Sequence, residues 1–305
     1  MKVLLTGASG RVGRAIYIRL CSGHEVLGYD QAPSSTADIV APLEDTDRLR
    51  GALEGVDAVV HTAALHAPHV GLRSESEFER VNVHCTAELV RLSLAAGIRR
   101  FVFTSTTALY GAAATPPGQA GWTTEDTVPQ PRTIYHRTKL QAENLLEAAA
   151  GRGELDVTVL RMSRCFPEPA PLMAAYRLHR GVDARDVADA HAVALTGSGT
   201  GFRRFIISGV TPFVPGDCKE LLESAPAVLR RRAPGLVAEF ERRSWPLPDR
   251  IDRVYSSNKA AKELGWNPQF GYAEVLAELD RRSSEVLPPL STRLQEAVTL
   301  ASVHG

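Results

Sequence analysis

The sequence predicts an α/β protein in which helices cover both faces of a parallel sheet and a smaller lobe follows toward the C-terminus. Three observations predict this fold. Short apolar runs alternate with amphipathic segments over the first part of the chain, a glycine-rich turn directly follows the first apolar run, and prolines and helical stretches replace the strand pattern after Ser208. With 305 residues, 44% of them hydrophobic, the chain is long enough for one large domain and an additional lobe.

The apolar runs define the expected strands. Six of them lie near residues 2–6, 25–29, 57–62, 100–105, 156–161 and 203–208, and a weak edge strand lies near 38–40. Helical patterns cover residues 11–21, 75–96, 133–150 and 184–196. Most of the runs are too short to distinguish a strand from a buried helix, so their regular alternation with helices decides the assignment.

A proline-rich patch at residues 165–171 interrupts the sheet pattern, and the pattern ends after Ser208. We therefore assign residues 1–161 and 183–210 to the sheet domain. The smaller lobe takes residues 162–182 and 211–305, and we expect it to bind the substrate.

Composition excludes several classes of protein. The formal net charge is +0, so no basic surplus favours nucleic acid. No stretch approaches the roughly 20 apolar residues that span a bilayer, and the N-terminal apolar run is too short for the core of a signal peptide. The four cysteines are scattered without a CxxC pair, which is typical of free thiols in a reducing cytosol. We expect a cytoplasmic protein that binds neither nucleic acid nor membranes.

A glycine-rich turn lies between the first expected strand and the first expected helix. Its first glycine permits a tight turn, its second lets the backbone approach a pyrophosphate, and its third allows close packing of helix on strand. A chance glycine-rich turn is disfavoured because the motif has the strand–helix context that it needs. The sequence therefore predicts a Rossmann-type, doubly wound sheet that binds a dinucleotide through Gly7, Ser9, Gly10, Arg11, Val12 and Gly13.

The second expected strand ends at Asp30, about 20 residues past the glycines. A carboxylate there accepts hydrogen bonds from the adenosine ribose and repels the 2′-phosphate of NADP. Residues 31–33 supply no cation to offset that repulsion, so the sequence favours NAD. A solvated turn residue is the alternative for Asp30. Asp38 and Ile39 are expected to flank the adenine, although Asp38 also fits a surface aspartate.

Tyr135 and Lys139 are four residues apart, which places them on one face of a helix. A lysine there lowers the tyrosine pKa from about 10 by stabilising the phenolate, and it also holds the nicotinamide ribose. A phenolate near neutral pH is a competent base for a substrate hydroxyl. The pair alone is weak evidence, because such spacings occur on many surface helices. The spacing of Tyr135 and Lys139 becomes evidence for a catalytic pair because the glycine motif lies upstream of it.

The expected strand near 100–105 ends in the hydroxyl-rich run Thr104-Ser105-Thr106-Thr107. Side chains at the carboxyl end of a parallel strand face the ligand crevice, so one of these hydroxyls can orient the reacting oxygen. Ordinary threonines of a β-rich edge are the alternative.

Together, the glycine turn, the Val59–Ala64 strand, Asn82, the Ser105-Thr106…Tyr110-Gly111 run and the Tyr135/Lys139 pair resemble an extended short-chain dehydrogenase/reductase. This group includes nucleotide-sugar epimerases and dehydratases. The resemblance covers residues 1–165 and resumes at 185–190 and 257–268. It implies that Thr106, Tyr135 and Lys139 are catalytic and that the protein is a homodimer paired through the helix at 75–96 and the helix carrying Tyr135. It also implies that Ala63, Ala64 and Asn82 lie at the cofactor, with a buried structural asparagine as the alternative for Asn82.

Two departures from that family narrow the expected reaction. Thr107 and Ala108 occupy the positions of the acidic pair of the 4,6-dehydratases, so dehydration is disfavoured. The segment between Met162 and Arg185 is short for a wall that binds a nucleotide sugar, and residues 161–169 are similar to uronate dehydrogenases, which oxidise a free sugar acid at C1.

Three further residues are candidates for contact with the substrate: His66, Thr107 and Arg164. A guanidinium is suited to binding a carboxylate or phosphate, although Arg164 also fits a structural salt bridge. Ordinary loop histidines are the alternative for His66 and His69. A metal site at these and His61 is disfavoured, because no carboxylate or cysteine joins them at ligand spacing.

The sequence thus predicts an NAD-dependent dehydrogenase or epimerase that acts on a sugar or nucleotide sugar with Tyr135 as acid/base. It does not separate net oxidation from epimerisation, and it does not identify the substrate. Redox chemistry on a non-sugar alcohol or carbonyl is one alternative. A non-catalytic NAD-sensing protein is another, against which the intact Thr106/Tyr135/Lys139 set argues.

Overall fold

The computed structural model describes residues 1–289 and contains a seven-stranded sheet with strand order β3-β2-β1-β4-β5-β7-β8. The strands are β1 (Lys2–Thr6), β2 (Glu25–Asp30), β3 (Ile39–Val40), β4 (Ala58–His61), β5 (Arg100–Thr106), β7 (Asp156–Met162) and β8 (Phe202–Ile207). Every neighbouring pair is parallel. The chain builds the sheet outward from β1 to β3 and then returns to β4, which creates the switch point where such sheets bind ligands. This arrangement confirms the predicted fold class.

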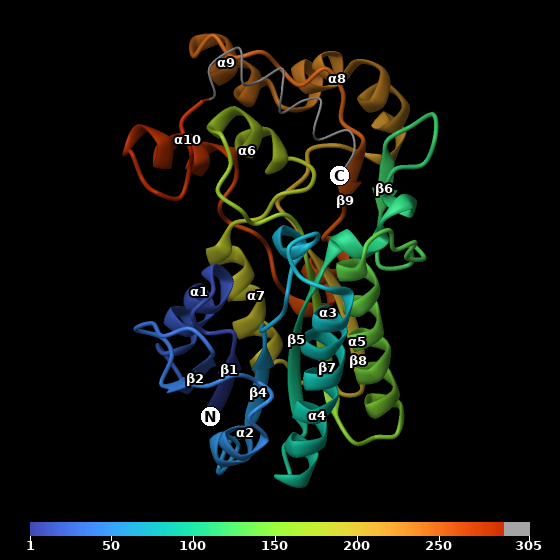
Figure 1. The fold of residues 1–305 in the computed structure, drawn as a ribbon. Coiled ribbons are helices and arrows are strands. Elements are labelled where there is room, and N and C mark those ends of the chain that lie inside the picture. The colour runs from blue at the N-terminus through green and yellow to red at the C-terminus, as the bar shows by residue number, and fades with distance from the viewer. Residues whose placement is uncertain (290–305) are drawn as a thin grey trace.

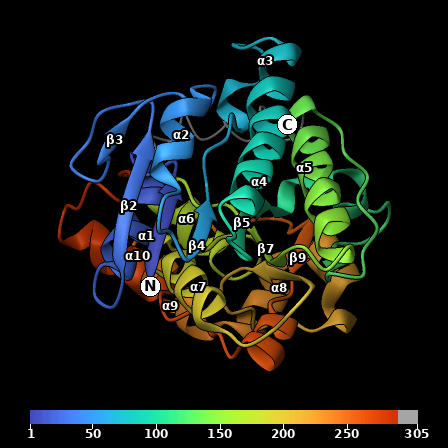
Figure 2. The same cartoon turned by 90° about the horizontal axis from the view of Figure 1, so that it is seen from below.

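Helices cover both faces of the sheet (Figures 1 and 2). On one face, α1 (Arg11–Leu20) and α7 (Ala184–Thr196) bury Ile16 and Val187 in a core with Val3. On the other, α2 (Thr46–Ala52), α4 (Cys85–Ala95) and α5 (Ile134–Gly151) form a second core, in which Leu146 meets Leu4. Neighbouring residues of one strand thus serve opposite cores, because successive side chains of a strand point to opposite faces.

The helix expected over 75–96 has three parts. These are α3 (Glu75–Glu79), a single π-helical turn (Arg80–His84) and α4. The described residues also contain short 3-10 turns at Ala67–His69, Thr107–Tyr110, Ala112–Ala114 and Pro215–Asp217, and a π-helical turn at Ala260–Leu264. A π turn inserts one extra residue into a helix and is frequent at functional sites.

The smaller lobe lies beyond the carboxyl ends of the strands (Figure 1). It contains α6 (Ala170–Tyr176), α8 (Cys218–Arg232), α9 (Pro234–Arg242), α10 (Tyr272–Asp280) and a two-stranded parallel sheet of β6 (Gly121–Thr123) with β9 (Arg253–Tyr255). Its own core includes Leu221, Leu236 and Val254.

The chain crosses the expected domain division at two places. Strand β6 comes from the segment assigned to the sheet domain, yet it pairs with β9 of the lobe. Conversely, Trp266 from the C-terminal segment packs in the core of the sheet domain, where its indole Nε1 donates to the Asp186 carbonyl at 3.0 Å. The two parts are therefore joined by exchanged segments as well as by the chain itself.

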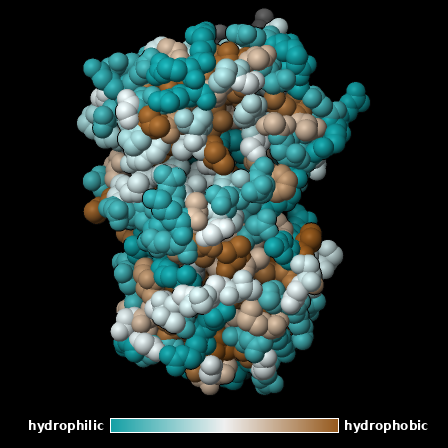
Figure 3. Space-filling view, turned by 180° about the vertical axis from the view of Figure 1, so that it is seen from behind, coloured by the Kyte–Doolittle hydropathy of each residue, from teal (hydrophilic) through white to brown (hydrophobic). Residues whose placement is uncertain are grey.

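None of the described helices is long and apolar enough to cross a membrane. Figure 3 shows one face of the molecule, on which hydrophobic residues lie in small groups among hydrophilic ones. The four cysteines are unpaired, and Cys21 alone is exposed.

Candidate active site

The glycine turn between β1 and α1 is a cradle that only glycine can form. Gly7 has a φ of +76°, and a Cβ there would lie 2.5 Å from the Thr62 hydroxyl and 2.6 Å from the Ala63 amide nitrogen. A Cβ on Gly13 would overlap the Gly7 carbonyl. Gly10 is the N-cap of α1, and the first turn of this ten-residue helix carries no acidic side chain. The free amides and the helix dipole there suit a diphosphate, so these residues fit the predicted dinucleotide.

Arg11 connects this cradle to the far side of the crevice. Its Nε donates to the Cys165 carbonyl at 3.1 Å, and its guanidinium forms an ion pair with Glu285. Glu285 is held nearby because Leu287 pairs with the backbone of Glu168 and Ala170. The Arg11 side chain therefore ties the glycine turn to the loop after β7, while its backbone lies at the N-terminus of α1.

Asp30 ends β2 directly beside the glycine turn. One carboxylate oxygen accepts from the Ser9 amide at 3.0 Å and the other from the Ala32 amide at 2.8 Å. The Ser9 hydroxyl donates to the Ala32 carbonyl at 2.5 Å. The turn and the strand end are thus fixed to each other, with Asp30 in the position predicted for a contact to the ribose.

Asp38 has a different environment. Its carboxylate accepts from the Gly28 amide at 2.7 Å and from the Tyr17 hydroxyl at 3.3 Å, so it joins β2 to α1. These bonds favour a structural role over the predicted contact with adenine.

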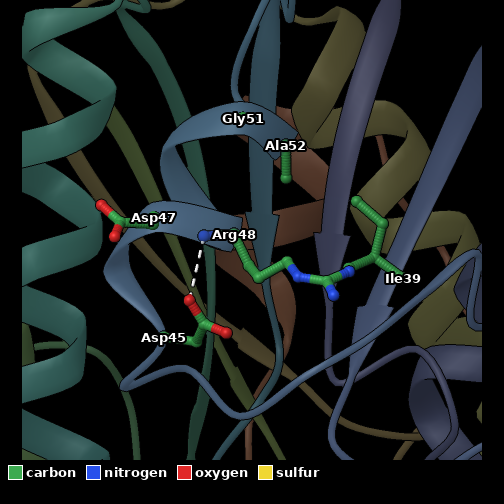
Figure 4. Close-up of a pocket in the computed structure, with 6 residues that line it drawn as sticks. All are labelled: Ile39, Asp45, Asp47, Arg48, Gly51 and Ala52. Atoms are coloured by element: carbon green, nitrogen blue, oxygen red, sulfur yellow. Dashed lines mark hydrogen bonds between the residues drawn. The ribbon is translucent and has the colours of Figure 1, made fainter.

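Ile39 lies in β3 and lines a surface pocket with residues of α2 and its N-terminal turn (Figure 4). None of the catalytic candidates lines that pocket, so it does not mark the reaction centre.

The catalytic candidates meet at the end of β5. Thr106 is the last residue of β5, and Tyr135 lies in the first turn of α5, which Thr133 caps by accepting from the His136 amide at 3.3 Å. The Thr106 hydroxyl lies near Tyr135, and its influence lowers the pKa of the Tyr135 phenol. Lys139 is 3% exposed, and its Nζ donates to the Thr104 carbonyl at 2.7 Å. The three residues that the sequence predicted to be catalytic are therefore brought together.

The pKa expectation for Tyr135 was wrong for the protein's own residues. Burial raises the pKa of Tyr135 to about 12, and the nearby Thr106 hydroxyl offsets this only in part. The Lys139 ammonium bonds to β5 and lies 3.9 Å from the centre of the Phe103 ring instead. Burial lowers the pKa of Lys139 to about 7, against the opposing charge of Glu143. Desolvation is thus the largest influence on the pKa of each group, and it disfavours the charged form of both.

Asn82 lies in the π-helical turn and is 2% exposed. Its amide oxygen accepts from the Leu65 amide at 2.8 Å, while its amide nitrogen donates to the Leu65 carbonyl at 2.9 Å and to the Thr138 hydroxyl at 3.1 Å. Asn82 thus fixes the loop that carries Ala63 and Ala64 to helix α5. These contacts are those expected of a buried structural asparagine. They also hold the loop beside Tyr135 and Lys139.

The predicted substrate residues line the loops after β4, β5 and β7. His66 stacks on Phe166, with ring centres 5.9 Å apart and planes 11° apart. Arg164 forms an ion pair with Glu168 and lies over the ring of Phe166, and Thr107 opens the buried turn after β5. The loops after β4 and β7 therefore meet through an aromatic contact, and the guanidinium of Arg164 is already paired.

His61 lies in the buried interior, where its ring nitrogens contact the hydroxyls of Thr6 at 2.6 Å and Thr86 at 2.9 Å. Within residues 1–289, no group of three histidine, cysteine, aspartate or glutamate side chains is arranged to hold a metal ion.

Glu143 and Arg161 were not among the residues predicted for the site. Both are buried, at 0% and 1% exposure, and their side chains form an ion pair with 2.6 Å between Arg161 Nη2 and Glu143 Oε2. The spacing of Glu143, four residues after Lys139, was the one signal that could have identified it.

Comparison with known proteins identifies a family for this chain. The model of the NAD dependent epimerase/dehydratase family matches residues 3–208. Sterol demethylase protein B of Methylococcus capsulatus is 32% identical over 230 residues, which are 70% of this chain and 62% of that protein. UDP-glucose 4-epimerase of Corynebacterium glutamicum is 26% identical over 326 residues, covering 91% of this chain and 94% of that protein.

Among solved structures, a short-chain dehydrogenase/reductase superfamily protein from Agrobacterium tumefaciens with bound NAD has the same fold. Its TM-score is 0.71, its identity is 23%, and the match covers 92% of this chain and 97% of that one. The chain spans only 39–62% of the length of several other curated relatives that it matches. The family match over more than half of the chain, with the glycine cradle and Asp30 in place, shows that this chain belongs to the NAD-dependent epimerase/dehydratase family, with NAD as its cofactor.

Proposed function

We propose that this protein moves a hydride between the nicotinamide of NAD and a hydroxyl-bearing carbon of a sugar or nucleotide sugar, with Tyr135 as the acid/base. The observation that carries the proposal is the meeting of Thr106, Tyr135 and Lys139 at the end of β5. That end lies at the edge of the sheet where the glycine cradle opens, and ligands of such sheets bind there.

Each of the three residues has a distinct task. The hydroxyls of Thr106 and Tyr135 orient the reacting oxygen of the substrate, since the end of β5 and the first turn of α5 bring them near each other. With its pKa at about 12, Tyr135 is protonated at neutral pH and is ready to donate a proton to a carbonyl. To act as a base toward a hydroxyl it needs positive charge nearby, and the Lys139 ammonium is the group of this chain placed to supply it. NAD, when bound, supplies the hydride acceptor.

Dehydration is disfavoured by the turn that follows Thr106. Thr107 and Ala108, which open this turn, carry no carboxylate that could act as acid or base in the elimination of water. Epimerisation and simple oxidation need no such group, so both remain within the proposal.

The test is an absorbance assay on the purified protein. Bound NAD is first measured, and neutral sugars, sugar acids and nucleotide sugars are then added while the reduced-nicotinamide band is followed. Stoichiometric reduction of added NAD identifies a dehydrogenase. Retained NAD with an inverted sugar product and no net reduction identifies an epimerase. Absence of both with all three sugar classes would contradict the proposal.

Redox chemistry on a non-sugar alcohol is the second candidate, because the match to sterol demethylase protein B reaches 32% identity. The same assay separates the two candidates when a hydroxysteroid is included, since only this candidate expects NAD reduction with the steroid alone.

The size of the substrate follows from the segment between Met162 and Arg185. It contains only the seven-residue helix α6, so less protein surrounds a nucleotide than a long insertion would provide. Binding energy from remote groups positions a large substrate for reaction. We infer a small sugar, or a nucleotide sugar held mainly by residues 211–270. A complex in which residues 162–185 enclose a nucleotide diphosphate would contradict this inference.

Arg164→Leu is expected to raise KM for an anionic sugar about tenfold and to leave KM for NAD unchanged, because a charged hydrogen bond to the substrate is lost. Steady-state kinetics with a sugar acid and its neutral counterpart measure this. Glu168→Gln is the matched variant: it frees the Arg164 guanidinium from its ion pair and is expected to lower the same KM. Unchanged kinetics in both variants would show that Arg164 does not bind the anionic group of the substrate. The assignment of Tyr135 would not be affected.

We also propose a homodimer that pairs through α4 and α5. In residues 1–289, none of the exposed large hydrophobic side chains lies on these helices, so the interface would be polar. Light scattering at micromolar concentration is expected to give twice the 33.0 kDa mass of the chain and less association at high salt. A mass of one chain at low salt would count against the dimer.

A further inference from the structure

A buried ion cluster lies next to the catalytic residues, and the proposed mechanism does not use it. Its centre is the carboxylate of Glu143, which is 0% exposed. The carboxylate accepts from the Ser105 hydroxyl at 2.5 Å and from Arg161 at 2.6 Å (Nη2) and 3.0 Å (Nε). Arg204 approaches the same carboxylate, with its Nε at 3.1 Å. Every oxygen of Glu143 therefore has a charged or hydroxyl partner.

The cluster joins the two elements that carry the catalytic candidates, β5 and α5, to the neighbouring strand β7. Ser105 directly precedes Thr106 on β5, and Glu143 follows Lys139 by one turn of α5. Arg161 comes from the neighbouring strand β7, and its Nη1 donates to the Tyr110 hydroxyl at 2.9 Å, in the turn that follows Thr106. The cluster thus fixes the end of β5 and the catalytic helix to each other.

Glu143 also has a distinctive place in the electrostatics of Lys139. The charged and titratable groups near Lys139 are Glu143 on α5, Tyr135 on the same helix and His61 on β4. Burial and the charge of Lys139 lower the pKa of His61 to about 3, so His61 is neutral. On the side of α7, His191 contacts Thr104 at 2.7 Å, and burial lowers its pKa to about 4. Glu143 is thus the carboxylate that acts on Lys139.

We propose that Glu143 is a positioning residue, which holds helix α5 against the end of β5 through Ser105 and Arg161 and places its carboxylate one helical turn from the buried Lys139 ammonium. The proposal rests on the function proposed for Tyr135 and Lys139. In this proposal the ion cluster does more than stabilise the fold. A buried ammonium loses its proton more readily, and a nearby carboxylate opposes that loss.

The sign of the effect follows from the two opposing causes. Burial lowers the pKa of Lys139 to about 7 and Glu143 raises it, so removal of the carboxylate lowers it further. Lys139 in Glu143→Gln is therefore expected to be largely neutral at pH 7. Its titration midpoint should fall by about one pH unit or more, since a nearby opposite charge shifts a pKa by roughly 1–3 units.

The experiment is an NMR titration of the full protein, with isotope-labelled lysine observed at Cε. The spectrum of Lys139→Met identifies the Lys139 resonance. Glu143→Gln is expected to lower the Lys139 midpoint, and Glu143→Asp is expected to restore it. Glu147→Gln is the matched control: Glu147 lies one turn further along α5, also pairs with Arg204, and is half exposed, so its removal should leave the midpoint unchanged.

Glu143→Gln leaves Arg161 and Arg204 near an uncharged side chain, and breaking a buried ion pair is strongly destabilising. If this variant does not fold, Glu143→Gln with Arg161→Gln is titrated against Arg161→Gln alone, and the midpoint of the double variant is expected to be the lower of the two. An unchanged midpoint in whichever variant folds would overturn the proposal, as would an equal shift in Glu147→Gln. The outcome is separate from the proposed function, because that function is tested by the absorbance assay and by the turnover of Tyr135→Phe.

Discussion

Tyr135→Phe is expected to lower turnover by a factor of roughly 10²–10⁴ while NAD binding stays within a factor of about two. In the proposed mechanism the phenolic hydroxyl is the group that exchanges a proton with the substrate, and it lies near the Thr106 hydroxyl at the end of β5. NAD affinity is expected to depend on the glycine cradle and Asp30, which the substitution does not touch. The ring itself stays in place, so the packing at the start of α5 is kept.

The measurement pairs two readouts on the same preparation. Turnover is followed by NAD reduction or by product inversion, and NAD affinity is followed by calorimetry. Tyr272→Phe is the control, since it removes the same hydroxyl from α10 of the lobe and should leave both readouts unchanged. Full activity of Tyr135→Phe across the pH range would end the assignment of Tyr135 as the acid/base.

The elements that the sequence predicted correctly depend on local patterns. The alternation of apolar runs with helices located the strands β1, β2, β4, β5, β7 and β8 to within about a residue or two at their ends. The glycine turn was predictable because the φ of Gly7 and the contact of Gly13 with the Gly7 carbonyl each require glycine. The i, i+4 spacing of Tyr135 and Lys139 likewise follows from one helix.

What the sequence could not predict depends on contacts between distant segments. The pairing of β6 with β9 joins Trp122 to Val254, and neither three-residue strand has a periodicity that reveals it. Asp38 was expected either to flank the adenine or to be a surface aspartate, and its bond from the Gly28 amide, across ten residues of chain, had no signal in the sequence. In the sequence, Glu143 has the pattern of a solvent-exposed helix residue. Only the structure shows that it is buried and paired with Arg161 of β7.

The pKa of Tyr135 shows the same limit at the level of energetics. Spacing placed a lysine one helical turn away, and a neighbouring cation lowers a tyrosine pKa. Spacing contains no information about burial, which raises the pKa of Tyr135 and lowers that of Lys139. The balance of the two effects could be worked out only once the surroundings of both side chains were known.

The second large effect is expected in cofactor choice. The wild-type protein should bind NAD more tightly than NADP. Asp30→Ala should weaken NAD binding about tenfold, because hydrogen bonds from the ribose hydroxyls to the carboxylate are lost. The same variant should bind NADP better, because the carboxylate no longer repels the 2′-phosphate. Asp30 ends β2 beside the glycine turn, and the next three residues carry no cation.

Asp38→Ala is the informative control, because it removes a carboxylate eight residues further along the same segment. If Asp38 only joins β2 to α1, the variant should lose stability in a denaturant titration and keep the ratio of the two cofactor affinities. A changed ratio in Asp38→Ala would restore its predicted role at the adenine. Tighter binding of NADP than of NAD by the wild-type protein would show that Asp30 does not select the cofactor, because a carboxylate at the ribose cannot favour the ligand that adds a phosphate there.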